Sequence, residues 1–569
     1  MSTLSSIEKT SRFTQHLPPD PAIPTPQAAD ENVKMTQTPR QVRGALFTYV
    51  KPQTSEDYEV LATSPACFET LGLDPAEANT QAFKDLVSGN GSLEGIYPWA
   101  QCYGGYQFGQ WASQLGDGRA ISLGEVKADG AHERFELQLK GAGKTPYSRF
   151  ADGNAVLRAS IREFLVSEYL HSLGIPTTRA LALTLLSKKA LRERIEPCAI
   201  VTRAAQSWIR IGTFDLLRRR GDRATMKKLA DYCIEHVFGG EEALAKNLPQ
   251  KETNSNRYEL LYREIVRRNA DLVGKLQAYG FMNGVLNTDN TSIFGLSMDY
   301  GPFAFMDTFD SAYTPNHDDG QLRYSYRMQP TIFWWNLTRL GEALAELFGT
   351  GSSVDAFFGR KDFLEGSMDD AELEPILTSA EKIIGEVAEE YKETFMKSYK
   401  LSMSKRFDMP IESEEDFKVV SEALTLMENY ELDFHHFFQR LSEEKFSGAA
   451  IVEGVQGNFG GIGRDKVIEE IDAYLEVYKK QVATHGIRID SERSLRMKKA
   501  NPAFVLRSWI LDEVIQRVEH KGERDILREV LDMSSHPFKQ CQTANGARFC
   551  GPVPSGTISG ANTQCSCSS

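Results

Sequence analysis

Cysteine is scarce in this sequence: its 569 residues include only eight, too few for the disulfide framework of a small secreted domain. There is no CxxC pair and no combination of Cys and His at a spacing suited to zinc. Four of the cysteines are scattered along the chain, and we interpret them as small buried side chains: Cys67, Cys102, Cys198 and Cys233. The sequence therefore argues against a disulfide-stabilised fold and against a structural zinc site.

Long apolar runs and an excess of basic residues are also missing. No stretch of roughly 18 uninterrupted apolar residues occurs, so the sequence predicts no membrane span. The formal net charge of −13 argues against a general nucleic-acid binder, which would carry a basic face. What remains is an ordinary globular composition, 41% hydrophobic and 25% charged, long enough for two or three domains or one large two-lobed enzyme.

The two ends of the chain differ in composition from its middle. Residues 1–40 are polar and Pro-rich, and we expect them to be disordered or processed. They lack the apolar core of a secretion signal, whereas their Ser, Thr, Lys9 and Arg12 allow a weak mitochondrial transit signal. We therefore predict a mitochondrial location, with the cytoplasm as the alternative. Residues 534–569 are rich in Gly, Ser, Thr and Cys and are expected to form a flexible tail.

Two parts follow one another between these ends. Residues 41–215 mix short strand-like runs with one strong helical pattern, whereas helical patterns dominate residues 216–533. The sequence thus predicts an α+β fold of the bilobal, protein-kinase-like type. In this interpretation a small mixed N-terminal lobe (41–215) and a large, mainly helical C-terminal lobe (216–533) enclose a cleft.

A glycine turn, Gly116-Asp117-Gly118, lies between apolar stretches and is followed by Arg119. Asp-Gly is a strong signal for a β-hairpin turn, which is the simpler interpretation. The alternative is a glycine turn whose backbone approaches phosphate oxygens, with Arg119 as a charged donor. The two interpretations are compatible, because the glycine-rich loop of a kinase is itself a hairpin turn.

A lysine ends the next predicted strand, in which Phe135, Leu137 and Leu139 alternate with polar residues in the pattern of a half-buried strand. Lys140 follows the glycine turn at the distance at which a kinase places its phosphate-pairing lysine. Such a lysine needs a carboxylate partner on a helix, and Glu163 has small neighbours one turn away. A Lys140–Glu163 pair and two separately solvated side chains remain equally good interpretations of the spacing.

The same helix, predicted from about residue 155, carries an apolar row at intervals of four that should face the core: Leu157, Ile161, Leu165, Tyr169 and Leu173. Two arginines follow it along the chain. Arg203 comes directly after an apolar run, and Arg210 lies between two isoleucines. A guanidinium stays charged and therefore needs an anion, which is either a structural carboxylate or a phosphate group.

Two polar clusters, Asn287 to Asn290 and Asp299 to Gly301, bracket the apolar run 292–298. Asn290 and Asp299 offer the hard oxygen ligands that magnesium or manganese prefers, and Asp289 beside them could accept a proton from a hydroxyl. The alternative is a pair of polar turns that cap a buried hairpin. No HRD motif precedes these residues, so an ordinary kinase is excluded.

Taken together these stretches resemble the selenoprotein O family, the kinase-like protein adenylyltransferases. The resemblance runs from about residue 38 to the C-terminus. Its motifs are long and unlike those of ordinary kinases: they include YGGYQFGQWASQLGDGRAISLGE, ELQLKGAGKTPYSRFADGNAVLRASIREFLVSEYLHSLGIP, VTRAAQSWIRIGTF, NGVLNTDNTSIFGLSMDYGPFAFMD and RYSYRMQPTIFWWNL.

The resemblance implies that AMP passes from ATP to a Ser, Thr or Tyr hydroxyl of a protein, with pyrophosphate as the leaving group and ATP bound inverted relative to a kinase. It assigns to Lys140 and Glu163 the ion pair that anchors the nucleotide. Asp289 would be the proton acceptor, and Asn290 and Asp299 would ligate Mg²⁺ or Mn²⁺. The implied ATP-binding positions are Gly116, Gly118, Arg119, Lys140, Asp152, Gly153, Arg203, Arg210 and Asp299.

The cysteines near the C-terminus fit the same family, many of whose eukaryotic members carry selenocysteine third from the end. Cys567 occupies that place and Cys565 lies two residues before it, a spacing suited to thiol–disulfide exchange. Some bacterial members have a cysteine before the Asn-His that follows the metal loop. This chain has Pro315 there, so the same redox link cannot form.

Three alternatives remain open from the sequence: a divergent kinase that moves the γ-phosphoryl group, a catalytically silent nucleotide-binding scaffold, and a thiol redox protein that works through Cys565 and Cys567. The sequence names neither the acceptor proteins nor the oligomeric state. It does not choose between Mg²⁺ and Mn²⁺.

Overall fold

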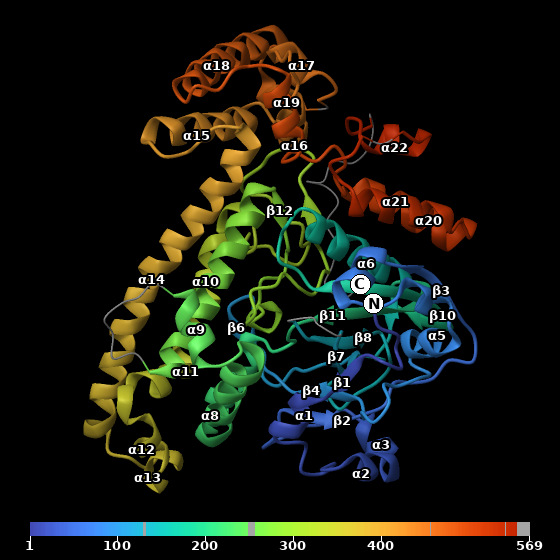
Figure 1. Ribbon diagram of the computed structural model, residues 1–569, viewed down its shortest axis with the longest axis vertical. Coiled ribbons are helices and arrows are strands. Elements are labelled where there is room, and N and C mark those ends of the chain that lie inside the picture. The colour runs from blue at the N-terminus through green and yellow to red at the C-terminus, as the bar shows by residue number, and fades with distance from the viewer. Residues whose placement is uncertain (129–132, 249–255, 456, 541, 555–569) are drawn as a thin grey trace.

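The computed structural model describes residues 1–554 except 129–132, 249–255, 456 and 541, and shows the predicted α+β architecture (Figure 1). A large antiparallel sheet and one long helix occupy the first part of the chain, and helices make up most of the remainder. The polar residues of the predicted site lie on the strands and loops where these two parts meet.

The main sheet has the strand order β2-β4-β7-β8-β11-β10-β3, with β1 paired to β7 and β9 paired to β11. Its strands are β1 (Glu8–Thr10), β2 (Phe47–Tyr49), β3 (Tyr58–Thr63), β4 (Trp99–Gln101), β7 (Ala120–Lys127), β8 (Phe135–Lys140), β9 (Ala155–Val156), β10 (Arg179–Leu191) and β11 (Ile195–Ala205). Two small two-stranded sheets lie outside it: β5 (Tyr106–Gln107) with β6 (Gln110–Trp111), and β12 (Phe281–Met282) with β13 (Ala304–Phe305).

Strand β8 differs from the half-buried strand that its alternation predicts. The apolar residues are buried as expected, but Glu136 and Gln138 on the other face are also buried. The second face of β8 is also covered, since Gln138 contacts Asp117 and Arg203 there and Trp208 packs on Arg203. The polar face is therefore an interior polar surface, and Lys140 at its end is the only residue of β8 that is not fully buried.

Helix α6 (Leu157–Ser172) packs against β10 and β11, and its predicted apolar row is buried from Leu157 to Leu173. The helix is buried on its other sides too, because α20 (Ser508–Lys521) and α21 (Asp525–Ser535) pack against it. Tyr169 extends this contact, since its hydroxyl donates to the carbonyl of Phe504. The last helices of the chain thus hold the helix that carries Glu163.

The helical part is centred on α10 (Arg257–Ala278), α11 (Gln329–Gly349) and the 38-residue α14 (Asp370–Phe407), which pack against one another. The other helices of this part are α7 (Ile211–Arg220), α8 (Arg223–Tyr232), α9 (Glu241–Asn247), α12 (Val354–Phe358), α13 (Lys361–Leu364), α15 (Glu414–Asn429), α16 (Phe434–Leu441), α17 (Gly448–Val452), α18 (Arg464–Thr484) and α19 (Ser491–Lys498). Asp369 begins α14 by accepting a hydrogen bond from the amide of Ala371, and Asp408 ends it in a left-handed conformation.

The expectation of a disordered segment at residues 1–40 is wrong for the structure. These residues form β1, α1 (Arg12–His16), α2 (Pro26–Glu31) and α3 (Val33–Thr36), and β1 extends the main sheet beside β7. Although the segment is polar on average, a few of its apolar side chains are buried in the core. One of them, Phe13, stacks on Trp99 with 6.3 Å between the ring centroids. Burial of such side chains fixes a segment whose average composition is polar.

The expectation of a flexible tail is also wrong for the part of residues 534–569 that the structure describes. Helix α22 (Ala544–Phe549) begins after Thr543, whose hydroxyl accepts from the amide of Gly546. Phe549 is buried and packs edge-on against Trp509 at 5.7 Å. Cys565 and Cys567 lie outside the described residues.

Helices α4 (Pro65–Leu71) and α5 (Gln81–Ser88) complete the elements around the sheet. Within the described ranges, no helix is both long and apolar enough to cross a membrane. This agrees with the absence of long apolar runs in the sequence.

Glu136 is a buried carboxyl whose replacement should stabilise the fold. Burial raises its pKa to about 8, Ser122 opposes the rise by donating a 2.6 Å hydrogen bond, and Glu125 across the strand pair adds to it. Since the unfolded carboxyl loses its proton near 4.5, the unfolded state binds fewer protons than the folded state between pH 4.5 and 8. Stability therefore falls as pH rises through that window.

We expect Glu136→Gln to raise the free energy of unfolding at pH 7.5 by about 1–3 kcal/mol and to have no such effect at pH 4. Urea denaturation at the two pH values measures this. Glu125→Gln is the matched control, because Glu125 accepts a 2.6 Å hydrogen bond from Arg12 and its replacement should lower stability at neutral pH. Equal effects of Glu136→Gln at both pH values would show that the carboxyl is already ionised in the folded protein.

Candidate active site

The segment between the two polar clusters is a turn rather than the predicted hairpin. Residues 292–298 are almost entirely buried, but their two ends pair with other segments: Ser292 forms a bridge with Arg210, and Ser297 forms one with Thr177. Gly295 closes the turn, with its amide donating to the carbonyl of Ser292 at 3.3 Å. The prediction of a hairpin was wrong because the two ends of the segment pair with Arg210 and Thr177 and not with each other. These pairings hold both polar clusters against the segments that precede α7 and β10.

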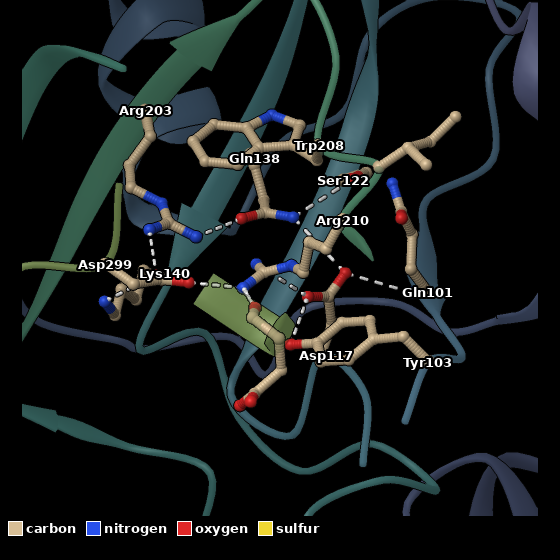
Figure 2. A network of polar contacts seen from close by, with 12 residues as sticks. Gln101, Tyr103, Asp117, Ser122, Gln138, Lys140, Arg203, Trp208, Arg210 and Asp299 are labelled. Atoms are coloured by element: carbon tan, nitrogen blue, oxygen red, sulfur yellow. Dashed lines mark hydrogen bonds and ion pairs between the residues drawn. The ribbon is translucent and has the colours of Figure 1, made fainter. Parts of the chain in front are cut away.

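Asp299 is the centre of the site, since its carboxylate contacts three cationic side chains (Figure 2). Its Oδ1 accepts from Lys140 at 3.1 Å and from Arg203 at 2.7 Å, and its Oδ2 accepts from Arg210. Burial opposes ionisation of Asp299, but the three cations outweigh it and hold the pKa well below its usual range. Asp299 also has a positive φ of 56°, an uncommon conformation for a residue other than glycine.

Glu163 of α6 supplies the second anion of this cluster. Its Oε2 lies 2.6 Å from Lys140 Nζ, so the predicted Lys140–Glu163 contact is confirmed as an ion pair. Its Oε1 lies 2.8 Å from Arg203 NH1. The sequence left open whether this pair forms, and it did not indicate that Arg203 would share the same carboxylate. Two carboxylates and three cations therefore form one buried network.

Arg203 is fixed on two further sides. Gln138 of β8 accepts a hydrogen bond from Arg203 NH2, and the guanidinium lies 4.3 Å from the ring centroid of Trp208. Trp208 is held in turn, because its indole NH donates to the carbonyl of Glu136 at 3.1 Å. The planar guanidinium is therefore oriented by an amide, an aromatic face and two carboxylates, which suits recognition of an anion with defined geometry.

Arg210 lies between Asp299 and a second buried carboxylate, Asp117. Arg210 NH2 is 3.6 Å from Asp117 Oδ1, and its guanidinium lies 4.5 Å from the ring centroid of Tyr103. Burial raises the pKa of Asp117, while Arg210 and the hydrogen bond from the Gln101 amide at 3.0 Å act against the rise. Asp117 is thus a buried counter-charge rather than the exposed residue of a simple hairpin turn.

Asp289 lies beside this network. Arg210 NH1 donates both to the carbonyl of Asp289, at 2.7 Å, and to Asp299, so the two polar clusters meet at one guanidinium. The Oδ2 atom of Asp289 accepts from Gln107 at 2.9 Å, whereas its Oδ1 is buried and has no hydrogen-bond partner among the described residues. Burial raises the pKa of Asp289 to about 6, and Gln107 and Arg210 limit the rise. Such a carboxylate can accept a proton.

Glycines bring the backbone close to Asp289. A Cβ atom on Gly105 would lie 2.7 Å from Asp289 Oδ1, and one on Gly212 would lie 2.2 Å from the carbonyl oxygen of Gly104. Neither glycine was singled out from the sequence, although both lie in the quoted motifs YGGYQFGQ and IRIGTF. Because these glycines have no side chain, the loop before β5 and the start of α7 can pack closely against Asp289.

Three glycine-containing loops lie together at the end of the sheet. The amide of Gly141 donates to the carbonyl of Arg119 at 2.7 Å, and the amide of Gly143 donates to the carbonyl of Gly153 at 3.0 Å. A Cβ on Gly153 would lie 2.2 Å from the backbone of Gly143, so only glycine fits there. Burial lowers the pKa of Arg119, and the carboxylates of Glu163 and Asp299 oppose that shift. Arg119 therefore lies close to the charged network, and Gly141 contacts its backbone.

Asp152 makes a different contact from the other predicted residues. Its carboxylate forms a two-pronged ion pair with Arg192, at 2.9 and 3.0 Å. Burial opposes its ionisation, but Arg192 and the amide of Asn154 lower its pKa to about 2. The sequence gave no indication of this partner, because Arg192 lies 40 residues further along, at the β10–β11 connection.

The oxygen atoms available to a cation are few but suitable. Across the described part of the chain, no group of three or more His, Cys, Asp or Glu side chains is placed to hold a metal ion. The amide nitrogen of Asn290 donates to the carbonyl of Val285 at 3.1 Å. The side-chain oxygen of Asn290 takes no part in that contact. Together with the carboxylate of Asp299, the side-chain oxygen of Asn290 is a hard-oxygen donor set of the kind that fits Mg²⁺ or Mn²⁺.

Sequence reasoning missed Asp117 as a counter-charge, Gln138 and Trp208 as supports of Arg203, and Gln107 as a donor to Asp289. Gln138 belongs to the polar face of a strand that was taken to be half exposed. A charged or amide residue that recurs on one face of a central strand could have indicated an interior polar network. No local pattern marks Gln107, because it contacts Asp289 across 182 residues of sequence.

Comparison with known proteins defines the class to which this fold and site belong. The family model described as "Protein adenylyltransferase SelO" matches residues 32–535. The chain is 42% identical to "Protein adenylyltransferase SelO, mitochondrial" of Schizosaccharomyces pombe, over 100% of this chain and 99% of that protein. It is 35% identical to the protein of the same name in Saccharomyces cerevisiae, over 87% of this chain and 85% of that protein.

A bacterial relative, "Protein nucleotidyltransferase YdiU" of Aromatoleum aromaticum, is 35% identical over 93% of both chains. The chain therefore belongs to the SelO family of protein adenylyltransferases. This confirms the resemblance noted in the sequence and the enzyme class, a nucleotidyltransferase acting on protein. The names of the two yeast relatives support the predicted mitochondrial location.

Proposed function

We propose that the charged network around Asp299 binds ATP in the orientation opposite to that of a kinase and transfers AMP to Ser, Thr or Tyr hydroxyls of proteins. The observation that carries this proposal is the convergence of Lys140, Arg203 and Arg210 on one carboxylate. Three cations in one buried cluster can hold a polyphosphate, and with the α-phosphoryl group as the one transferred, they stabilise the departing pyrophosphate.

In this proposal the molecule is kinase-like and bilobal, with residues 41–215 as the N-lobe and 216–533 as the C-lobe. Lys140, anchored by Glu163, and the two arginines exchange part of their contact with Asp299 for phosphate oxygens. Because Arg203 and Arg210 are already oriented by Trp208 and Tyr103, they need little rearrangement to do so. The loops with Gly116, Gly118, Arg119, Asp152 and Gly153 complete the nucleotide site.

Asp289 is the proposed proton acceptor. Gln107 orients its carboxylate, and no cationic side chain of the described residues forms an ion pair with it, so the carboxylate can take the hydroxyl proton of the acceptor. As the proton moves to Asp289, the hydroxyl oxygen forms a bond to the α-phosphorus and the bond to the pyrophosphate oxygen breaks. The negative charge that leaves with pyrophosphate is stabilised by the arginines.

Asn290 and Asp299 are the residues that would hold Mg²⁺ or Mn²⁺. A divalent cation bound there would neutralise phosphate charge and make the phosphorus more electrophilic. Asn290 fits this role through its oriented amide, and Asp299 fits it through its strongly acidic carboxylate.

The experiment that tests the proposal is incubation with ATP labelled on either the α- or the γ-phosphate, in the presence of a generic protein acceptor. We expect label on protein from α-labelled ATP alone, and none from either label with Asp289→Ala. Label from γ-labelled ATP alone would establish a divergent kinase. No label from either, with ATP binding retained, would leave a nucleotide-binding scaffold.

A further inference from the structure

A surface of arginine and aromatic side chains begins directly beside Asp289. The β5–β6 hairpin lies over the segment that carries this acid: the amide of Tyr106 donates to Thr288 Oγ1 at 2.8 Å, and Gln107 donates to Asp289 at 2.9 Å. The tip residue, Phe108, is 39% exposed, and its amide donates to Asn287 Oδ1 at 3.3 Å. In Figure 1 the label β6 lies between the main sheet and α11.

Arg219 of α7 forms one side of this surface. Its Nε donates to the hydroxyl of Tyr106 at 3.0 Å, and its guanidinium lies 5.5 Å from the ring centroids of Tyr106 and Trp111. Arg219 is otherwise exposed. A guanidinium that rests on two aromatic rings is partly dehydrated but keeps donors free for an anion.

Arg323 forms the other side. Its guanidinium lies 4.7 Å from the ring centroid of Trp335 of α11, and Trp335 packs edge-on against Tyr106 at 5.6 Å. Phe108 packs against Tyr324 at 5.3 Å, next to Leu322, which is 42% exposed. The two arginines therefore flank one aromatic cluster next to Asp289, and together with the exposed Phe108 and Leu322 they form one surface. We call it the Arg219–Arg323 surface.

The guanidinium groups of this surface lack the carboxylate partners that most arginines of the described residues have. Neither Arg219 nor Arg323 forms an ion pair with any carboxylate of the residues that the structure describes. Their neighbours Arg218 and Arg339 share a single carboxylate, that of Glu342, with Arg218 at 3.1 Å. A chain of net charge −13 thus has, beside its proposed proton acceptor, two guanidinium groups without a carboxylate partner among the described residues.

We propose that the Arg219–Arg323 surface docks the acceptor protein through Asp or Glu side chains near the hydroxyl that receives AMP. This inference rests on the proposed function, since it takes Asp289 as the proton acceptor. Charge complementarity selects an acidic segment, and the exposed Phe108 and Leu322 add apolar contact to it. The carboxylates bind the two guanidinium groups and place the acceptor hydroxyl at Asp289.

Direct binding tests the surface without any chemistry. The probes are two 15-residue peptides with a central Ala in place of Ser, one flanked by Glu and one by Lys, measured by fluorescence anisotropy at low salt. We expect the wild type to bind the Glu peptide about 5- to 10-fold more tightly than the Lys peptide. The double variant Arg219→Gln, Arg323→Gln should lose this preference but keep its affinity for a fluorescent ATP analogue.

Arg528→Gln is the matched control, because Arg528 is an exposed arginine on α21 and its replacement should leave the preference unchanged. Persistence of the preference in the double variant would overturn the docking surface, as would tighter binding of single-stranded RNA than of the Glu peptide. The Ser peptides with α-labelled ATP separate the two proposals. Label transfer without an arginine-dependent preference overturns docking alone, whereas arginine-dependent binding without label transfer supports the surface and overturns the transferase site.

Discussion

Asp299→Ala should abolish AMP transfer, with a loss of at least about 1,000-fold, while ATP binding in the absence of divalent cations is retained or becomes tighter. The reason is that Asp299 has two opposed roles. Its carboxylate competes with phosphate oxygens for Lys140, Arg203 and Arg210, and it is also the proposed ligand of the divalent cation. Removing it frees three cations for the triphosphate but removes that ligand.

The two halves of this expectation are measured separately. Label transfer from α-labelled ATP measures the reaction, and calorimetric titration with ATP in EDTA measures the affinity. Asp416→Ala is the control: Asp416 is a buried carboxylate that accepts from His485 at 2.7 Å in the helical part, so its loss should lower stability but not transfer. If Asp299→Ala bound metal-free ATP much more weakly than the wild type, Asp299 would not be competing with the phosphates.

The sequence drew attention to several side chains of the charged network because these residue types have few other uses in such positions. A guanidinium between two isoleucines must find an anion, and this reasoning located Arg210 correctly. A lysine at a strand end and a glutamate among small residues on a helix made a Lys140–Glu163 pair one of two open interpretations, and the structure contains that pair. The α+β class followed from the change in periodicity along the chain.

The other features of the fold and of the site could not be predicted, because they depend on contacts between residues that are far apart in the sequence. Periodicity in β8 could not show that its polar face is interior, because the side chains that cover it, such as Arg203 and Trp208, come from a later part of the chain. The Asp-Gly turn gave no sign that Asp117 would be buried beneath Arg210, 93 residues away. The N-terminal segment was misjudged because average composition hides a few side chains, such as Phe13, whose burial suffices to order it.

We expect Arg203 to be required both for the stability of the fold and for AMP transfer. It is 1% exposed and joins Glu163, Asp299 and Gln138, so its removal leaves buried carboxylates with fewer partners. Loss of one member of a buried ion pair costs about 3–5 kcal/mol, and we expect Arg203→Met to lower the free energy of unfolding by that amount. Arg203→Lys keeps the charge but loses the planar fork that reaches all three partners.

We therefore expect Arg203→Lys to recover part of the stability while transfer remains at least about 100-fold below that of the wild type, measured at a temperature where both proteins are folded. Arg493→Lys separates the two effects. Arg493 is equally buried, but it contacts Tyr478 and the carbonyl of Leu441 in the helical part, away from the phosphate-binding network. Its replacement should reduce stability without a comparable loss of transfer. Near-normal transfer by Arg203→Lys would mean that this position needs only a positive charge, and that the orientation imposed by Gln138 and Trp208 serves the fold alone.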